Sequence, residues 1–290
     1  MQLSQFYEQV LKFGIETDPR KDKAAIKHYP DTAVLYGEPD KEIRKILVGI
    51  DVDVAELLLA DKIRSRQGLD LVIAHHPQGK AYAAFYEVMQ LQVDLLEKIG
   101  LSRSVAQEFL EERKREVERR VLPANHMRSV DAARLLDMAF MCIHTPADNH
   151  AADFVHKLIS KAKPANLGQI VEVLNTVAEY QKANEGLVGP RIILGNPKRP
   201  TGKIYVEMTG GTEGPKDIYD KLYKSGVRTL VAMHLSEEHF KKVKDVNLNV
   251  VVAGHISSDT LGLNLLLDKI EKEKKFLISC CSGFYRIRRT

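Results

Sequence analysis

Residues 69–77 read Leu-Asp-Leu-Val-Ile-Ala-His-His-Pro, and this stretch decides the fold that we expect. Its branched apolar side chains predict a buried strand, which Pro77 ends because it has no N–H for the ladder. His75 and His76 therefore come directly at the end of a strand. In an open α/β sheet, ligands bind outside the carboxyl ends of the strands, so this position suits a functional site. Taken alone, the pair is explained equally well by two histidines that are exposed to solvent or cap the end of the strand.

A second strand and a helix precede this stretch and complete a βαβ unit. Residues 45–53 read Lys-Ile-Leu-Val-Gly-Ile-Asp-Val-Asp and predict a buried strand, and residues 54–65 predict the crossover helix. The crossover in such a unit is right-handed and its strands are parallel. Asp51 falls at the exit of the strand, whereas Asp53 is expected to cap the helix. The pattern therefore predicts an α/β fold.

Apolar segments farther along the chain predict further strands, with helices between them. We expect strands at residues 139–143, 191–194, 204–208, 229–233, 249–253 and 275–279, and a helical region at residues 80–137. Glycine and proline are most frequent in residues 184–203, which suggests a domain junction there, or slightly earlier near Lys163 and Pro164. A chain of 290 residues is long enough for two domains, although one large α/β domain fits the same pattern.

The composition is that of an ordinary globular protein. The net charge of +4 is small beside 43 basic and 39 acidic residues, so no nucleic-acid partner is indicated. No apolar run approaches the ~20 residues that span a bilayer, and the first residues do not resemble a secretory signal. Cys142, Cys280 and Cys281 leave an odd number without Cys-x-x-Cys spacing, which predicts buried free thiols. We therefore expect a cytoplasmic protein with no membrane partner.

Histidines and carboxylates recur where other predicted strands end. His144 and Asp148 follow the strand predicted at residues 139–143, His234 and His239 follow the one at 229–233, and His255 and Asp259 follow the one at 249–253. Taken singly, each is explained as well by helix capping or by exposure to solvent. Their recurrence at strand ends favours one shared site, because such ends meet at the same edge of a sheet.

The residue types indicate a metal site. Imidazole and carboxylate bind zinc, iron, manganese or nickel, and the lack of a cysteine pair argues against a structural zinc site. The candidate ligands are His75, His76, Asp148, His255 and Asp259. This set exceeds one tetrahedral site and suits two ions that share a carboxylate. Because a pair of ions lowers the pKa of bound water, we expect hydrolysis with water as the nucleophile.

Three motifs also resemble those of a known family, in the same order. Residues 70–77, 143–148 and 254–259 resemble the motifs of the Nif-three-like family. This family comprises the relatives of NGG-one-interacting factor three and includes proteins called GTP cyclohydrolase I type 2. The resemblance covers most of the chain except the helical region at about 80–130.

The resemblance implies two α/β domains with mixed or parallel sheets flanked by helices, and a metal site at the domain interface. The first domain is expected at residues 1–160, with a helical insertion at about 80–130 that we assign to a lid or an assembly surface. The second is expected at residues 161–290 and contributes the Gly-His-x-x-x-Asp motif. A homo-oligomer, typically a hexamer, is also implied.

By the same resemblance, the chain would hold two divalent ions, with zinc, iron or manganese as the expected metals. His75 and His76 would be ligands from the first strand exit, His255 would be the third imidazole, and Asp148 a carboxylate that bridges. Asp259 departs from the family, which generally has glutamate at this position. Because aspartate is one methylene shorter, the departure predicts either a closer helix, an intervening water or a weakly bound second ion.

The implied activity is hydrolysis of a C–N bond in a nucleotide-like substrate by metal-bound water. His144 and His239 would be the catalytic groups beside the metal, orienting the substrate or moving a proton. The alternative is a non-enzymatic metal-binding scaffold or a regulatory interaction protein.

Overall fold

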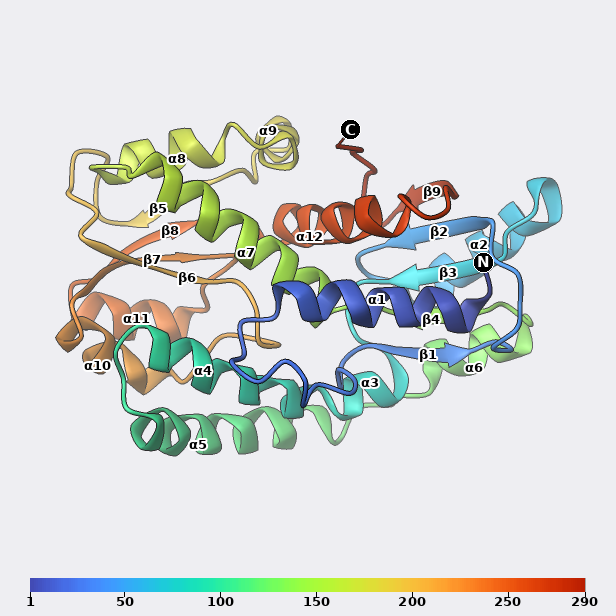
Figure 1. Cartoon of the computed structure of the whole chain (residues 1–290), viewed down its shortest axis with the longest axis horizontal. Coiled ribbons are helices and arrows are strands. Elements are labelled where there is room, and N and C mark those ends of the chain that lie inside the picture. The colour runs from blue at the N-terminus through green and yellow to red at the C-terminus, as the bar shows by residue number, and fades with distance from the viewer. Residues whose placement is uncertain (290) are drawn as a thin grey trace.

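The structure is a computed structural model that describes residues 1–289, and its two β-sheets lie side by side (Figure 1). The strands are β1 (Ala33–Tyr36), β2 (Lys45–Gly49), β3 (Leu71–Ala74), β4 (Phe140–Cys142), β5 (Arg191–Leu194), β6 (Lys203–Glu207), β7 (Val227–Ala232), β8 (Asn249–Val252) and β9 (Leu277–Cys281). They run in the order β1-β4-β3-β2-β9 in the first sheet and β5-β8-β7-β6 in the second. β1 is antiparallel to β4 and β5 to β8, whereas the other pairs are parallel. The expected α/β fold with two mixed sheets is thus confirmed.

Helices flank both sheets and fill most of the intervals between strands. The α-helices are α1 (Leu3–Thr17), α2 (Val54–Gln67), α3 (Gly79–Ala83), α4 (Leu91–Lys98), α5 (Arg103–Val121), α6 (Arg128–Leu135), α7 (Thr145–Ala162), α8 (Leu167–Leu174), α9 (Ala178–Glu185), α10 (Tyr219–Lys224), α11 (Glu237–Asp245) and α12 (His255–Ile270). Short 3₁₀ helices, η1 (Phe85–Gln90) and η2 (Lys216–Ile218), complete the set. The region at residues 80–137 is largely helical, as its apolar periodicity predicts.

The first sheet separates two apolar cores because successive strand residues point to opposite faces. Ile46 and Val48 of β2 pack in one core with Phe6 of α1 and residues of α12. Leu47, between them in sequence, packs on the other face with Leu57 of α2. The sheet is therefore the middle layer of an α/β/α arrangement.

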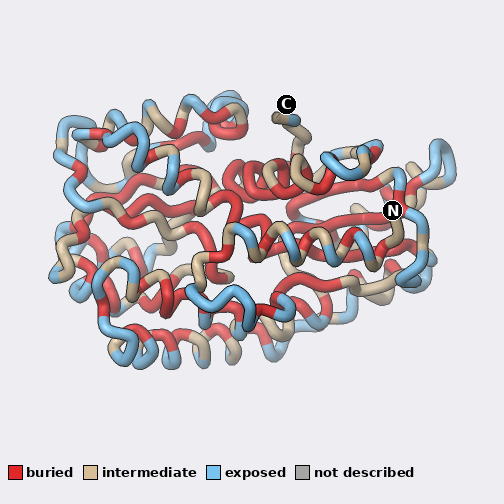
Figure 2. Tube along the Cα trace, viewed as in Figure 1, coloured by how far each residue is buried: buried red, intermediate tan, exposed pale blue. Residues whose placement is uncertain are grey.

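The second sheet has the same layered construction. Val231 of β7 packs with Val155 of α7, whereas Leu230 packs on the opposite face with Leu110 of α5. The helical insertion is thus an outer layer of this sheet, and its expected role as a lid or an assembly surface stays a prediction. Its apolar side covers a sheet face that would otherwise meet water. Figure 2 shows buried backbone through the strands and central helices, with exposed turns on the outer side of α5.

The end of the chain returns to the first sheet. β9 lies beside β2, and α12 packs against both α7 and α1. The first sheet therefore takes strands from the beginning and from the end of the sequence. The division into residues 1–160 and 161–290 stays a prediction, and residue 290 lies outside the described residues.

Local signals account for two details near the first strands. Asp53 caps α2 and forms a capping box with Glu56, as expected. β1 was not predicted, because its four residues follow a polar loop and are too short to show periodicity. No helix within residues 1–289 combines the length and apolar character needed to cross a membrane.

Candidate metal centre

The ends of strands from both sheets meet at the candidate site. His75 and His76 follow β3, and His144 follows β4 of the same sheet. His255 follows β8 of the second sheet and begins α12. Asp148 and Asp259 each lie one helical turn after a histidine, Asp148 in the first turn of α7 and Asp259 at the start of the second turn of α12. Side chains far apart in sequence therefore converge between the sheets.

His75, His144 and Asp148 form one buried group that could hold a metal ion. The Nε2 atom of His75 lies 3.3 Å from Oδ1 of Asp148. The Nε2 atom of His144 lies 3.6 Å from Oδ2 of the same carboxylate. Asp148 therefore offers one oxygen to each imidazole.

A second group that could hold an ion consists of His75, His76 and Asp259. Oδ1 of Asp259 lies 3.5 Å from Nε2 of His75, and its Oδ2 lies 3.5 Å from Nε2 of His76. His255 approaches the same oxygen, with Nε2 3.6 Å from Oδ2. The shorter aspartate thus reaches the three imidazoles directly, because α12 begins at His255 and lies close to them.

Unpaired polar atoms show that these residues fit a cation. Nε2 of His75, Oδ1 of Asp148 and Oδ2 of Asp259 are buried and have no hydrogen-bond partner among the described residues. Buried polar atoms are nearly always paired, and unpaired ones need an explanation such as an ion. Imidazole nitrogen and carboxylate oxygen are also suitable donors for zinc, iron or manganese.

Hydrogen bonds at Nδ1 fix the orientation of three of the imidazole rings. Nδ1 of His75 lies 2.9 Å from the carbonyl oxygen of Ile143 and so donates to it. Nδ1 of His76 lies 2.7 Å from Oδ1 of Asp51, and Nδ1 of His144 lies 2.8 Å from Oδ2 of Asp31. With Nδ1 protonated, each Nε2 keeps its lone pair for a metal ion, as metal-bound histidines commonly do.

Asp31 was not found by the sequence analysis. It is fully buried and also accepts a hydrogen bond of 2.6 Å from Oγ1 of Thr145. Its position two residues before β1 is the signal that could have found it, but that strand was not predicted. His144, in turn, lies among the candidate ligands and is held like them, although a catalytic role was expected for it.

The two carboxylates dominate the electrostatics of the cluster. Burial alone would lower the pKa of His75, but Asp259 and Asp148 outweigh it and raise the pKa to about 10. Burial is likewise outweighed at His76, whose neighbours Asp259 and Asp51 raise its pKa to about 8. Burial would raise the pKa of Asp259, but the nearby imidazoles hold it well below its usual value. The cluster thus favours positive charge between its carboxylates.

His239, the other expected catalytic group, lies in a separate hydrogen-bond network. Its Nε2 is 3.0 Å from the carbonyl oxygen of Gly214, and its Nδ1 is 2.8 Å from Oγ of Ser236. Glu213 Oε2 is 3.3 Å from the same Nδ1, and the ring is buried. This geometry fixes the turn that carries Glu213, and the catalytic role of His239 stays a prediction.

Two cavities adjoin the cluster. A cavity of about 40 Å³ lies against Asp148 and Asp259 and is also lined by Glu213, His234 and Thr209. A larger cavity of about 410 Å³ lies in front of the histidines, where its lining includes His76, His144, His255, Tyr82, Phe85 and His126. The last three belong to the region at about 80–130, which therefore contributes an aromatic wall that the sequence analysis did not single out. A cavity of this size and lining can hold a small molecule.

The fold and the site define a class: an α/β protein with two mixed sheets and buried His/Asp groups that could hold metal ions. The chain matches a NIF3 superfamily protein from Sphaerobacter thermophilus with 28% identity and a TM-score of 0.81, over 96% of this chain and 98% of that one. The chain is thus similar over nearly its whole length to a NIF3 superfamily protein, which agrees with the resemblance of the three motifs to the Nif-three-like family.

More distant structures share the fold. Reduced HcgD from Methanocaldococcus jannaschii matches with 17% identity and a TM-score of 0.55, over 97% of both chains. TTHA1606 from Thermus thermophilus matches with 15% identity and a TM-score of 0.52, also over 97% of both chains. No family model and no curated protein matches the sequence.

Proposed function

We propose that the chain is a hydrolase that depends on two divalent metal ions and cleaves a C–N bond of a nucleotide-like substrate. The observation that carries the proposal is the set of buried, unpaired atoms on His75, Asp148 and Asp259. Asp148 and Asp259 line the small cavity, and His144 and His255 line both that cavity and the neighbouring one of about 410 Å³, which is large enough for a substrate. The resemblance to proteins called GTP cyclohydrolase I type 2 supports the same reaction class.

The candidate ligands divide into two similar sets. His75, His144 and Asp148 would hold one ion, and His76, His255 and Asp259 the other. Each set combines one residue of the His75-His76 pair with a histidine and an aspartate one turn apart. Asp259 also faces His75 with its other oxygen, so its carboxylate reaches histidines of both sets, whereas the bridging role expected for Asp148 stays a prediction. Two bound divalent ions would act as Lewis acids and would lower the pKa of a bound water molecule.

The remaining residues would position the ligands and the substrate. Asp31 and Asp51 fix the rings of His144 and His76, which directs each Nε2 toward the carboxylates. The ring of Phe85 lies 5.5 Å from that of His144, at the edge of the larger cavity. Aromatic side chains at this distance offer flat apolar surface, which suits the ring of a nucleobase.

The test is turnover by the purified, metal-loaded protein with GTP and a panel of other nucleotides, followed by chromatography of the products. We expect a product whose formation is lost in the variant His75→Ala with His76→Ala. The matched control is His28→Ala, because His28 is exposed and lies outside the candidate site. Turnover that survives the double substitution would overturn the proposal. Metal held tightly with no turnover across the panel would instead favour the scaffold or regulatory function.

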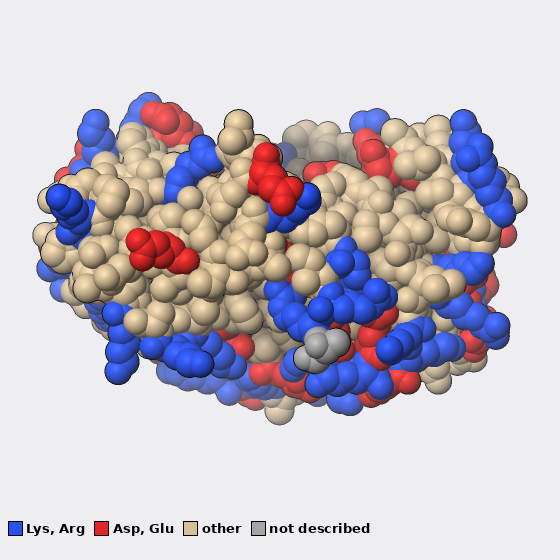
Figure 3. Space-filling model, turned by 90° about the horizontal axis from the view of Figure 1, so that it is seen from above, with Lys and Arg blue, Asp and Glu red and all other residues tan. Residues whose placement is uncertain are grey.

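We also propose that the chain assembles into a homo-oligomer, by family resemblance a hexamer, in the cytoplasm. Exposed apolar side chains at Leu187, Val188 and Ile193 support an assembly surface near β5, an edge strand of the second sheet. Figure 3 shows that the face seen from above has few charged side chains over much of its area. Light scattering after gel filtration tests this, and a monomer at micromolar concentration would overturn it.

A further inference from the structure

A cavity of about 370 Å³ lies outside the candidate metal centre, between the loop after α1, helices α4 and α7, and strand β6. It is separated from the centre by the first turn of α7. Asp148 lines the small cavity of the centre, whereas its neighbour Asn149 lines this one. Thr209 lines both, so it belongs to the wall between them. The volume is within the usual range for ligand sites.

The wall of this cavity is built from fixed groups. Asp18 accepts hydrogen bonds of 2.9 and 2.8 Å from Nε and one terminal nitrogen of Arg20, and a bond of 2.7 Å from the hydroxyl of Tyr29. Asn149 donates to Asp18 over 3.1 Å and accepts from Thr209 over 2.6 Å. These bonds hold the loop against α7 and β6. A preformed cavity loses little entropy when a ligand binds.

The cavity has positive charge that no acidic side chain neutralises. Lys23 and Lys98 donate hydrogen bonds of 2.6 Å to the carbonyl oxygens of Glu16 and Pro19. Neither ammonium forms an ion pair with a carboxylate among residues 1–289. The acidic side chains of the lining are already paired, Asp18 with Arg20, Glu16 with Lys269 and Asp153 with Lys157.

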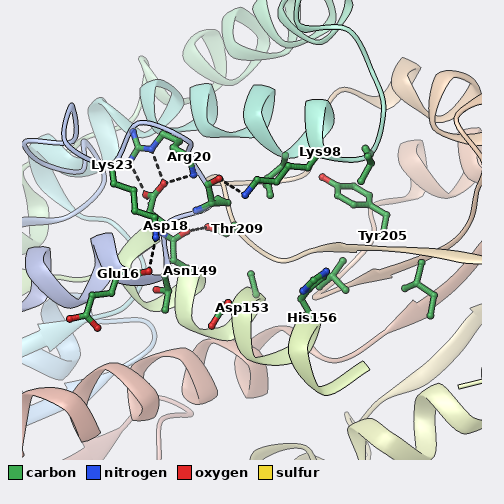
Figure 4. A pocket seen from close by; sticks show the side chains of 17 residues that line it. Glu16, Asp18, Arg20, Lys23, Lys98, Asn149, Asp153, His156, Tyr205 and Thr209 are labelled. Carbon is green, nitrogen blue, oxygen red and sulfur yellow. Dashed lines mark hydrogen bonds and ion pairs between the residues drawn. The ribbon is translucent and has the colours of Figure 1, made fainter. Parts of the chain in front are cut away.

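The hydroxyl of Tyr205 also faces the cavity without a partner among the described residues. Tyr205 is only 6% exposed, and its hydroxyl forms no hydrogen bond with any described residue. Figure 4 shows this hydroxyl pointing into the pocket on the side of Lys98, while His156 extends into it from α7. Burial raises the pKa of Tyr205 well above its usual value, so the group is a hydrogen-bond donor at neutral pH. Ala152, Ile204 and Val206 supply apolar wall.

We propose that this cavity binds a small molecule with one oxyanion, a carboxylate or a phosphate, attached to an apolar body. Lys98 and the hydroxyl of Tyr205 receive the oxyanion, Lys23 adds positive charge to the wall, and the apolar wall receives the body. The inference does not depend on turnover at the metal centre. Its failure would therefore leave the proposed hydrolase function intact.

The test is calorimetric titration of the metal-free protein with phenyl phosphate and with 3-phenylpropanoate, which separate the two oxyanions. The neutral probe 3-phenylpropanol serves as the control ligand. We expect at least one anion to bind about tenfold more tightly than the alcohol, because a charge-assisted hydrogen bond is lost with the latter.

Variants locate the binding. Lys98→Met should weaken it about tenfold and Tyr205→Phe about threefold, in line with the loss of one charged and one neutral hydrogen bond. Ala152→Leu should block it by filling the cavity, whereas Ala152→Ser at the same position should not. The matched control for the charge is Lys62→Met, because Lys62 is exposed on α2 and does not line the cavity.

Three results would overturn the proposal. They are absence of binding at millimolar concentrations of both anions, affinity unchanged by Lys98→Met and Ala152→Leu, and binding that is lost in His75→Ala with His76→Ala. The last result would place the anion at the metal centre. Circular dichroism of each variant shows whether it is folded, and Lys23→Met replaces Lys98→Met if the latter is not.

Discussion

Asp148 and Asn149 are neighbours in the first turn of α7, yet their side chains belong to two different polar networks. Asp148 faces His75 and His144 and has an oxygen without any partner in the described chain. Asn149 is equally buried, but both ends of its amide are hydrogen-bonded, to Asp18 and to Thr209. One network is therefore incomplete within the protein and the other is complete.

This difference separates a candidate binding site from a structural support. A buried carboxylate with a free oxygen costs stability unless a cation neutralises it, so the Asp148 network is expected to gain most from metal. A fully paired network contributes to folding by itself and should not respond to metal. Substitutions on the two sides of α7 should accordingly change different measurements.

His75→Ala is expected to have the largest effect, because His75 belongs to both groups of candidate ligands. The variant should lose the ion next to Asp148 and bind the ion next to Asp259 more weakly. Elemental analysis after gel filtration measures the bound metal, with His28→Ala as the exposed control. Metal content equal to that of the wild type would contradict the proposed centre. Because bound metal stabilises only the folded state, the wild type should also gain more thermal stability on metal addition than the variant does.

Asp18→Ala should produce the second largest effect, a loss of stability. The substitution lies in the network of Asn149, on the side of α7 that faces away from the candidate metal centre. The substitution leaves Arg20, Tyr29 and Asn149 without their shared acceptor, which should lower the free energy of unfolding by about 3 kcal/mol. Urea denaturation followed by circular dichroism measures the change, with Asp40→Ala as an exposed control. Metal content should stay at the wild-type level. A loss of metal in Asp18→Ala would show that the two networks are not independent.

Asp31→Asn compared with Asp51→Asn tests how the rings are held inside the metal centre. Asp31 is fully buried behind His144, whereas the side chain of Asp51 is 68% exposed behind His76. Loss of a carboxylate behind a metal-bound histidine typically lowers metal affinity by about 10- to 100-fold. We expect Asp31→Asn to lower metal affinity by an amount near the upper end of this range and Asp51→Asn by an amount near the lower end. Water can replace the exposed carboxylate of Asp51 as a hydrogen-bond partner, but it cannot reach the buried position of Asp31. Metal titrations with a chromogenic competitor measure both, and equal losses would contradict this ranking.

Much of the fold was predictable from local patterns. β2, β3 and β7 are apolar runs that end at polar residues, and the spacing of apolar residues in α1 and α7 is helical. The position of β9 was not predictable, because strand order depends on packing between distant segments. The place of the insertion against the second sheet was not predictable for the same reason. Its helices were recognised, but their periodicity does not say which sheet they cover.

The candidate site was predicted in its residue types and less so in its geometry. His75, His76 and Asp148 were singled out because they follow strands, and the structure brings them together. His144 lies among the candidate ligands, and its expected catalytic role stays a prediction. Its ring orientation depends on Asp31, which no motif marks. Tyr82 and Phe85 come from the insertion, where aromatic residues could equally have been part of a core. Sequence position thus identifies the strand ends, whereas the partners behind each ring follow only from three-dimensional packing.

The pH dependence of the Asp18 network is the smallest expected effect. Burial would raise the pKa of Asp18, but the hydrogen bonds and the charge of Arg20 outweigh it and lower the pKa below its ordinary value of 3.8. A carboxyl group with a lower pKa in the folded state stabilises the protein fully above its unfolded-state pKa. This contribution is lost as the pH falls through the folded-state value. The stability difference between the wild type and Asp18→Asn should therefore be constant from about pH 7 to pH 5 and shrink below about pH 4. Urea denaturation across this range measures it, and a difference that does not shrink in acid would mean that the charge of Asp18 contributes nothing to holding the loop against α7.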